Sequence, residues 1–471
     1  MKYIFGILLL FSGFNTFSQS ISSDNKSIER AFALAIKTVD DNTRDGILAA
    51  GADYGGEWTR DISINSWNGA SLLRPGVAEA SLWSVTIDKD TVGHQYWDKI
   101  IWVIAAYNHY LVTGDKNFLG KAYQCSINTM EQLELTAFDK KYNLFTGPSV
   151  FNDGIAGYPE PVFEPGNKSS YVLDHKGSDR IKCLSTNAIY YGAYNAILRM
   201  QQALGKSATA ALYQAKSKKL KNSILQHFYN KQQHKFNYLV DQNGKVDHSQ
   251  EGLGISFAVL FGIVEGEDAR LLIKNASVSA FGITSIYPDF PRYSRDKPGR
   301  HNNIVWPMVN GFFARAALLS GNTAVFSKEL QNLARLALEP GKGNNDFKEI
   351  YNAYTGQPDG GWQANGTDAE HHWTSCKAQT WSATAFMSML INGVAGFNFK
   401  ESGLVIRPYL PSGMQQLSLK GIPYRKASLN IDIKGKGKTI KSFVLDGKVQ
   451  KKDFIIDSDI SGQHSIAITV E

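Results

Sequence analysis

The sequence predicts a mainly α-helical fold, an (α/α)6 toroid, followed by a small C-terminal antiparallel β-sandwich. Apolar residues recur with helical spacing up to about residue 395, similar glycine-containing turns separate the helical stretches, and the apolar period then changes to two. At 471 residues the chain is also longer than one hydrophobic core usually supports. We therefore expect a helical domain over 21–397 and a β-sandwich domain over 398–471.

The first twenty residues have the pattern of a secretory signal peptide. Lys2 precedes an apolar run over 4–11, and small or polar residues follow through Ser18. The apolar run is too short to span a bilayer, and the expected cleavage point has no cysteine nearby that could carry a lipid. We expect a signal peptide over 1–20 and a periplasmic or secreted protein without a membrane anchor.

Composition and charge are those of an ordinary globular protein, with 43% hydrophobic and 20% charged residues. The densest basic stretch, Lys434 to Lys441, lacks interleaved aromatic residues, so we interpret it as a solvated face and expect no nucleic-acid partner. Cys125, Cys183 and Cys376 do not have the spacing of metal ligands. Neither a metal nor another cofactor is predicted, and one disulfide or three buried thiols are both compatible with the sequence.

Five stretches carry apolar residues at positions i, i+3, i+4 and i+7, which predicts amphipathic helices with one buried side. In the second stretch, for example, Ile189, Ala193 and Ile197 share a face. The stretches are 97–111, 185–204, 208–228, 304–319 and 325–338.

A recurring turn separates the helical stretches. Gly114 and Gly321 stand in similar surroundings, and Gly205 followed by Ser207 is a shorter version. Glycine can take the left-handed conformation that ends a helix, and the Asp, Asn, Thr or Ser nearby can cap the next helix. The chain has room for about a dozen helices. Six hairpins that close into a toroid are the economical arrangement, and their long loops would share one face.

Beyond residue 396, apolar and polar residues alternate in short runs between Gly, Pro and Asp turns, which predicts strands. The runs lack the clustered aromatic and acidic residues of the helical part. We therefore expect the β domain to support the helical domain and to contribute no catalytic side chain. The runs are 403–408, 427–433, 439–445 and 465–470.

Four long loops concentrate aromatic and acidic residues, which suggests that they build one shared pocket. Sugars have flat apolar faces with hydroxyl rims, so indole rings beside carboxylates suit them. In the alternative interpretation, Trp362, Trp373 and Trp381 simply fill a core. The loops are 51–65, 147–165, 287–306 and 347–391.

Glycosidic bonds are cut by two carboxyl groups, one that protonates the leaving oxygen and one that activates water or attacks the carbon. Twelve loop acids are candidates, and their positions alone do not rank them. They are Asp53, Glu57, Asp61, Asp153, Glu160, Glu164, Asp289, Asp296, Glu349, Asp359, Asp368 and Glu370.

Over about 50–395 the chain also carries motifs in the order found in a group of glycosidases. The motifs are Trp58-Thr-Arg-Asp61, Asn152-Asp153-Gly154, Ser185-Thr-Asn187, Trp306-Pro-Met-Val-Asn310, Lys348-Glu349-Ile-Tyr351 and Thr380-Trp381-Ser382. With them, the chain resembles the six-hairpin glycosidases of glycoside hydrolase family 63, which include processing α-glucosidase and mannosylglycerate hydrolase, with trehalase as a related family. The resemblance implies an (α/α)6 barrel and an inverting, exo-acting hydrolase of α-linked oligosaccharides or glycosides, of α-glucosidase or α-mannosidase type.

The resemblance implies roles for three residues: Asp153 matches the general acid, Glu349 the general base, and Asp61 an acid that binds sugar hydroxyls. Tyr351 and His371 or His372 could orient the attacking water. The chain departs from the family pattern before Asp153 and in a longer insert over 357–372. The expected substrate-binding residues are Trp58, Arg60, Asp61, Asn152, Trp306, Tyr351, Trp362, Trp373, His372 and Trp381.

Two other hypotheses stay open at this level. The same barrel hosts polysaccharide lyases, epimerases and phosphorylases, and a lyase could use Tyr293 as base with Arg292, Arg295, Arg300 and His301 around a uronate. A non-catalytic carbohydrate-binding protein would need the aromatic residues but not the acids.

Overall fold

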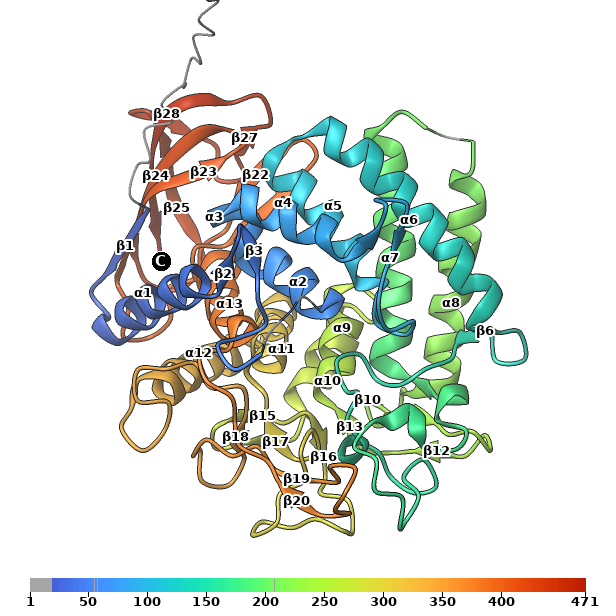
Figure 1. Cartoon of the computed structure of the whole chain (residues 1–471). Helices are drawn as coiled ribbons and strands as arrows, with labels where there is room; N and C mark the ends of the chain where they lie inside the picture. Colours follow the sequence, from blue (N-terminus) through green and yellow to red (C-terminus); the bar gives the residue numbers. More distant parts are fainter. Residues whose placement is uncertain (1–18, 55, 57, 207) are drawn as a thin grey trace, which may run out of the picture.

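The computed structural model describes residues 19–54, 56, 58–206 and 208–471. A large helical region is followed by a C-terminal region of strands, which confirms the mainly helical class and the C-terminal β region (Figure 1). Most of the predicted signal peptide, 1–18, lies outside the described residues, as do the candidate acid Glu57 and the candidate helix cap Ser207.

The helices lie close to the stretches that apolar periodicity predicts. The five predicted stretches correspond to α5, α7, α8, α11 and α12. The α-helices are α1 Lys26–Asp41, α2 Thr59–Asn65, α3 Ser71–Leu73, α4 Pro75–Ser84, α5 Ile101–Thr113, α6 Lys116–Thr136, α7 Leu184–Ala203, α8 Ala210–Phe228, α9 Gly252–Leu260, α10 Gly266–Lys274, α11 Pro307–Leu319, α12 Thr323–Leu338 and α13 Thr380–Ser388. Two π-helical segments, η1 Ser66–Ala70 and η5 Met389–Val394, border α2 and α13.

One set of helices is in contact in a closed order. Helices α2, α5, α7, α9, α11 and α13 each contact the next, and α13 contacts α2. The helices between them in sequence pack against this set, and α1 packs against α13. The burial pattern agrees, because all of α13 is buried whereas α1 buries one side with Ile28, Phe32 and Ala35. The first set therefore forms the inner layer of the helical region.

The predicted turn glycines have the expected backbone conformation. Gly114, Gly205 and Gly321 have φ angles of 73°, 66° and 83°. Asp115 caps α6, since its side chain accepts hydrogen bonds from two backbone amides of the first turn. Asn322 stands at the same place before α12 but makes no side-chain cap hydrogen bond. At these turns the glycine is therefore a more reliable sign of the end of one helix than the polar residue is of a capped start of the next helix.

The connections that lead into the inner helices are long and carry short paired strands. Because each connection ends where an inner helix begins, loop residues gather at the N-terminal ends of these helices, in the lower part of Figure 1. The short strands are β2 Thr43–Arg44, β3 Ile47–Leu48, β4 Thr86–Ile87, β5 Thr91–Val92, β6 Phe138–Asp139, β7 Leu144–Phe145, β8 Lys182–Cys183, β9 Tyr229–Asn230, β10 Lys235–Phe236, β11 Leu239–Val240, β12 Val246–Asp247, β13 Gln250–Glu251, β14 Val278–Ser279, β15 Gly282–Ile283, β16 Ile286–Tyr287, β17 Ile304–Val305, β18 Tyr351–Asn352, β19 Trp362–Gln363 and β20 His371–His372.

The C-terminal strands form a six-stranded sheet of order β1-β23-β24-β28-β25-β26 and a three-stranded sheet of order β21-β22-β27. The first strand comes from the N-terminal segment, which the sequence did not predict. The strands are β1 Ser20–Ser23, β21 Phe397–Lys400, β22 Gly403–Ile406, β23 Gln416–Tyr424, β24 Lys426–Gly435, β25 Ile440–Leu445, β26 Lys448–Gln450, β27 Ile455–Asp457 and β28 Ser461–Val470.

Strands β24 and β28 are parallel, from Lys426 opposite Ser461 to Gly435 opposite Val470. The predicted wholly antiparallel arrangement is therefore wrong for this pair. Period-two alternation fixes which face a side chain occupies, but it is the same for both strand directions.

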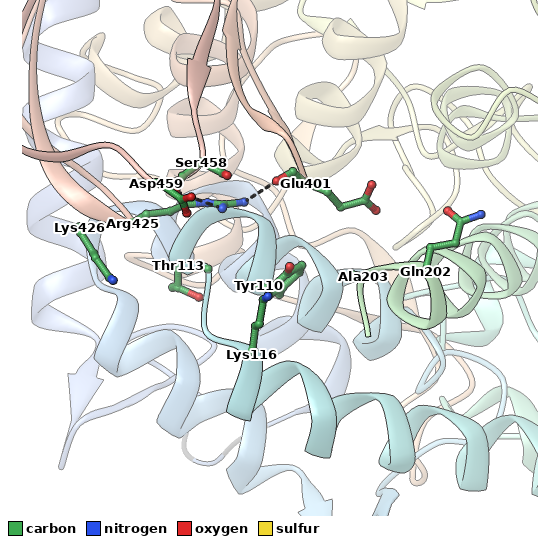
Figure 2. Close-up of a pocket in the computed structure, with 11 residues that line it drawn as sticks. Tyr110, Thr113, Lys116, Gln202, Ala203, Glu401, Arg425, Lys426, Ser458 and Asp459 are labelled. Carbon is green, nitrogen blue, oxygen red and sulfur yellow. Dashed lines mark hydrogen bonds between the residues drawn. The ribbon is translucent and has the colours of Figure 1, made fainter. Parts of the chain in front are cut away.

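Arg425, in the turn between β23 and β24, fastens the sheet to the helical region. Its guanidinium donates hydrogen bonds to the backbone carbonyls of Lys400, Glu401 and Ser458 at 3.2–3.3 Å, as Figure 2 shows for part of this cluster. Its backbone amide donates to the carbonyl of Val112 near the end of α5, at 3.1 Å. The guanidinium thus joins segments of the β region to one another, and the backbone amide is one of the contacts between the β region and the helices.

All three cysteines are free thiols; Cys125 and Cys183 are buried, and Cys376 is partly buried. Of the two compatible arrangements, the structure therefore has the three thiols. Among the described residues, no helix is both long and apolar enough to cross a membrane.

Candidate active site

A cavity of about 230 Å³ lies at the N-terminal ends of α2, α11 and α13, and we call it the central pocket. All four loops that the sequence singles out contribute to it. Its lining residues come from 50–381, so none belongs to the β region. They are Ala50, Tyr54, Trp58, Arg60, Asp61, Phe151, Asp153, Arg300, His301, Trp306, Glu349, Gln363, Trp373, Gln379 and Trp381.

Several of these side chains lie at or next to the first residue of a helix. Trp58, Trp306 and Gln379 are the residues immediately before α2, α11 and α13, and each has extended backbone geometry. The first turn of α2 then carries Arg60 and Asp61. Three inner helices thus direct their N-terminal ends, with the positive end of the helix dipole, toward one small volume.

Arg60 organises the first of two charge clusters. Its guanidinium lies 2.9 Å from the carboxylate of Asp153 and 3.7 Å from those of Asp61 and Asp98. The side chain of Asp153 is 25% exposed, whereas those of Asp61 and Asp98 are 4% and 2% exposed. Asp153 is therefore the member of this cluster that the pocket can reach most easily.

Burial raises the pKa of Asp61 and of Asp98 to about 7. The charge of Arg60 opposes this shift, and the charge of Asp153 adds to it. Three carboxyl groups share one guanidinium, so full ionisation of all three is unfavourable. The cluster holds a proton near neutral pH.

Arg300 organises the second cluster, around Glu349. Its Nη2 donates to Oε1 of Glu349 at 3.0 Å and to the hydroxyl of Tyr54 at 3.3 Å, and Tyr54 lies 3.4 Å from the same carboxylate oxygen. Burial, together with the charge of Glu349, raises the pKa of Tyr54 well above its ordinary value. Tyr54 therefore stays a neutral hydrogen-bond donor beside a buried carboxylate.

Aromatic rings form the walls between the two clusters. Trp306 stacks on His301 with ring centroids 4.3 Å apart and meets Trp381 edge-on at 5.4 Å. The indole nitrogens of Trp306 and Trp381 are buried without a hydrogen-bond partner among the described residues, as are both amide atoms of Gln379. Buried donors and acceptors without a partner are costly, so the pocket wall carries an unfavourable polar arrangement at these positions.

Two wall residues have backbone angles that L-residues seldom adopt. Phe151 and His301 have φ angles of 64° and 63°, and such positions cost about 1–3 kcal/mol each. Nδ1 of His301 and Oδ1 of Asn152 are 3.1 Å apart, which ties the two loops together. A Cβ at Gly157 would lie 1.9 Å from the amide of Asn152, so only glycine leaves room for this contact.

A buried carboxyl group holds the loop that precedes Asp153. Glu251 accepts hydrogen bonds from the hydroxyls of Ser149 and Ser185 and, at 2.9 Å, from the backbone amide of Ser185. The hydroxyl of Ser185 in turn accepts from the amide of Val150 at 3.0 Å. Burial raises the pKa of Glu251 to about 7. We call Ser149, Ser185 and Glu251 the loop clamp.

The predicted site residues fall into two groups. Eight of them line the central pocket: Trp58, Arg60, Asp61, Asp153, Trp306, Glu349, Trp373 and Trp381. The other four, Asn152, Tyr351, Trp362 and His372, are not among its lining residues.

Each of these four has another environment. Asn152 supports the wall through His301. Tyr351 is fully buried beside Val305, and its hydroxyl accepts from the amide of Lys348 at 3.1 Å. It therefore belongs to the core and not to the pocket.

Trp362 and His372 stack on each other at 5.0 Å, and His372 pairs with Asp359 at 2.8 Å. Trp362 lines a neighbouring cavity of about 330 Å³ that also includes Gln363. The insert over 357–372 thus borders the central pocket instead of filling it. His371 and His372 are not among the lining residues of the central pocket, and the side chains of Tyr54 and Arg300 contact Glu349.

Sequence reasoning missed Tyr54, Asp98, Phe151, Gln363 and Gln379 as site residues, and it offered Arg300 and His301 only for a lyase. Asp98 stands at the edge of the apolar stretch that becomes α5, so periodicity masks it. A signal was available for the others, because all of them lie in the four aromatic loops.

Paired carboxyl groups in one cavity are what the cleavage of a glycosidic bond requires, and aromatic walls suit a sugar ring. Residues 77–382 match the family model of the mannosylglycerate hydrolase MGH1-like glycoside hydrolase domain. The chain belongs to this family, which confirms the resemblance to the family 63 glycosidases. No curated protein matches the sequence.

Solved structures with a similar fold have low sequence identity. A sialidase aligns with a TM-score of 0.68 and 14% identity, over 89% of this chain and 39% of its own. A GH78 family rhamnosidase of a Bacillus species aligns with 0.63 and 11%, over 96% and 44%. The GH63 mannosylglycerate hydrolase from Thermus thermophilus in complex with glucose aligns with 0.60 and 13%, over 76% and 99%. The chain thus spans less than half of the first two proteins but nearly all of the third.

Proposed function

We propose that the protein is an inverting, exo-acting glycoside hydrolase for α-linked oligosaccharides or glycosides, with Asp153 as general acid and Glu349 as general base. One observation carries the proposal: both carboxyl groups line the same pocket, and each is held by its own arginine beside indole rings. The proposed hydrolysis needs two carboxyl groups at one anomeric carbon, and the central pocket supplies them.

Glu349 has the surroundings that a base needs. Its carboxyl group accepts a hydrogen bond from Arg300 at 3.0 Å, and the hydroxyl of Tyr54 is a second donor at 3.4 Å. The acceptor sites of the carboxylate that these donors leave unused can take a proton from water. The water would then attack the anomeric carbon from the side opposite the leaving group.

Asp153 has access to a proton in its own cluster. Asp153 shares Arg60 with Asp61 and Asp98, whose pKa values burial raises to about 7. Because Asp153 is the most exposed member, it is the group through which the proton can reach a leaving oxygen. Asp61 then binds a sugar hydroxyl from beside the same arginine.

The size of the pocket supports exo action. A volume of about 230 Å³ is below the roughly 300–1,000 Å³ of common ligand pockets, and it suits one sugar ring better than a chain. A gluco- or manno-configured ring is the first choice. The similar Thermus protein is a mannosylglycerate hydrolase whose structure holds glucose, and another of its structures holds Tris and D-glycerate.

The remaining proposals concern architecture and location. The closed order of inner helix contacts supports an (α/α)6 toroid over 21–397, next to a β-sandwich over 398–471 that β1 extends. The leader pattern supports a periplasmic or secreted protein. Recovery of the mature protein in the soluble fraction outside the cytoplasm would be the expected result of cell fractionation, and retention of an uncleaved chain in the cytoplasm would contradict it.

The alternative reactions have less support. Of the groups a lyase would use, Arg300 and His301 line the central pocket, but Tyr293, Arg292 and Arg295 do not. Arg292 instead donates to backbone carbonyls of the acid loop, including that of Ile155 at 3.1 Å. A pure binding protein has no need for two arginine-held carboxyl groups in the pocket.

The test is proton NMR of the first-formed sugar during digestion of a panel of α-linked disaccharides and α-glycosides. Release of a monosaccharide as its β-anomer, before mutarotation, is the expected result. Release of the α-anomer would contradict the proposed mechanism. An unsaturated product that absorbs in the ultraviolet would favour a lyase, and binding without turnover across the panel would favour a binding protein.

A further inference from the structure

A second cavity, of about 660 Å³, lies toward the C-terminal ends of the inner helices, and we call it the basal cavity. Helix α11 connects the two sites: it begins directly after Trp306 of the central pocket and ends at Leu319 of the basal cavity. A helix of this length spans about 20 Å. The lining residues are Trp67, Asn108, Leu260, Arg315, Leu318, Leu319, Asn392, Gly393, Gly396, Phe397, Asn398, Phe399, Arg407, Pro408, Tyr409 and Lys438.

The charged side chains that line the basal cavity are all positive. They are the cations Arg315, Arg407 and Lys438, and no Asp or Glu is among the described residues that line the cavity. Within the described part of the chain, none of the three cations forms an ion pair with a carboxylate. The cavity in Figure 2 differs, because Glu401 and Asp459 accompany its cations.

Arg315 is the most enclosed of the three cations. Its guanidinium lies over the ring of Trp67 at 5.2 Å, and Nη1 donates a long hydrogen bond, 3.4 Å, to Oδ1 of Asn68. Burial lowers the pKa of Arg315 to about 10. An enclosed guanidinium without a carboxylate partner is costly, so an anion at its unused donors would stabilise it.

The surroundings of Arg315 are rigid and partly polar. Trp67 packs against Phe312 at 5.1 Å and Phe261 at 6.0 Å, which fixes the ring beneath the guanidinium. Three lining residues belong to the π-helical segments: Trp67 to η1, and Asn392 and Gly393 to η5. Such segments occur frequently at functional sites, and here they form the wall between α11 and the connection into the β region.

We propose that the basal cavity binds a small ligand through an oxyanion group, a carboxylate, sulfate or phosphate. Arg315 is the inner anchor, Arg407 and Lys438 contact the ligand at the exposed rim, and the aromatic rings cover its apolar part. Lys438 belongs to the basic stretch over 434–441, so part of that stretch has a partner in this arrangement.

Isothermal titration calorimetry at constant ionic strength tests the proposal with three probes: sodium sulfate, inorganic phosphate and glucuronate. Saturable binding to one site is expected for at least one probe. Arg315→Gln should weaken binding about tenfold or more, because it removes a charge-assisted contact. The control is Arg335→Gln, which removes the same charge from an exposed arginine of α12 that pairs with Glu339. This control should bind like the unchanged protein.

The variants also separate the basal cavity from the central pocket. Binding that is lost in Arg300→Gln and kept in Arg315→Gln would place the anion beside Glu349 and overturn the proposal, as would the absence of saturable binding. If Arg315→Gln does not fold, the double variant of the exposed rim, Arg407→Gln with Lys438→Gln, should show the loss instead, and unchanged binding there overturns the proposal. Tighter binding of glucuronate than of sulfate identifies a sugar-borne carboxylate, and the reverse identifies a free oxyanion.

Discussion

Arg300 Nη2 and Glu349 Oε1 lie 3.0 Å apart, and their side chains are only 7% and 4% exposed. The loss of one member of such a pair leaves the other as an uncompensated buried charge, which costs about 3–5 kcal/mol. The same guanidinium reaches the hydroxyl of Tyr54 and the carbonyl of Gly360. The carboxylate that the proposed mechanism uses as base is therefore fixed by three loops at once.

Glu349→Gln should reduce kcat for every substrate about a hundredfold or more, because water activation is needed whatever the leaving group. It should also destabilise the fold, since Arg300 loses its counter-charge. Steady-state kinetics with a disaccharide and an activated aryl glycoside measure the first effect, and thermal unfolding measures the second. Glu370→Gln, which changes an exposed acid of the neighbouring insert, is the control and should keep full activity. Full activity of Glu349→Gln would remove this residue from the role of base.

Asp153→Asn should separate substrates by leaving group. Hydrolysis of a disaccharide should fall about 10²–10⁴-fold, whereas an activated glycosyl fluoride should be hydrolysed nearly as before, since only the former needs the proton. The measured quantity is the ratio of kcat/KM for the disaccharide to kcat/KM for the glycosyl fluoride. This ratio is compared between Asp153→Asn and the unchanged protein. Asp296→Asn, at an exposed acid of another pocket loop, should leave the ratio unchanged. An equal loss for both substrates would contradict the role of Asp153 as acid.

The loop clamp predicts an effect on catalysis without contact to the substrate. Glu251→Ala should free Ser149 and Ser185 and let the loop of Asp153 move, so kcat should fall about tenfold or more while KM changes little. Glu251→Gln keeps an acceptor for these hydroxyls and should restore most of kcat. Equal losses in the two variants would contradict a positioning role. Circular dichroism confirms that both variants are folded.

Much of the fold follows from local sequence because helix burial is periodic. The stretch over 304–319 illustrates this: its apolar spacing predicts a helix, and Pro307 at the first turn of α11 agrees with it. The pairing of β1 with β23 does not follow, since Ser20 and Lys420 are far apart in sequence and nothing in a four-residue strand specifies its partner. Local sequence pattern identifies individual helices and strands, whereas contacts between residues far apart in sequence determine which of these elements pack or pair together.

The sequence predicts those parts of the site that residue type and motif reveal, but not those that depend on contacts between distant loops. Asp153 and Glu349 stand in aromatic loops, and motif order separates them, together with Asp61, from nine other acids. Tyr351 shows the limit: it adjoins the proposed base in sequence, but strand β18 turns its ring into the core. Tyr54, which does reach Glu349, comes from a loop about 300 residues away, and only the closed order of the helices brings it there.

A last prediction concerns stability and pH at Glu329, a buried carboxyl outside the pocket that accepts from the amide of Ile283 at 3.1 Å and from Asn310 at 2.7 Å. Burial raises its pKa from 4.5 to about 7. The folded state therefore keeps the proton on Glu329 up to a higher pH than the unfolded state does. The contribution of this proton to stability is present below pH 4.5 and is lost as pH rises through 7.

Glu329→Gln cannot ionise, and Asn310 can turn its unpaired Oδ1 toward the new amide. The difference in unfolding free energy between this variant and the unchanged protein, measured with urea, should increase in favour of the variant by up to about 3 kcal/mol as pH rises from about 5 to 8. Glu339→Gln, whose exposed carboxyl has a lowered pKa because Arg335 donates to it, should show no such gain; a pH-independent difference for Glu329→Gln would mean that this carboxyl is ionised in the folded protein throughout the range.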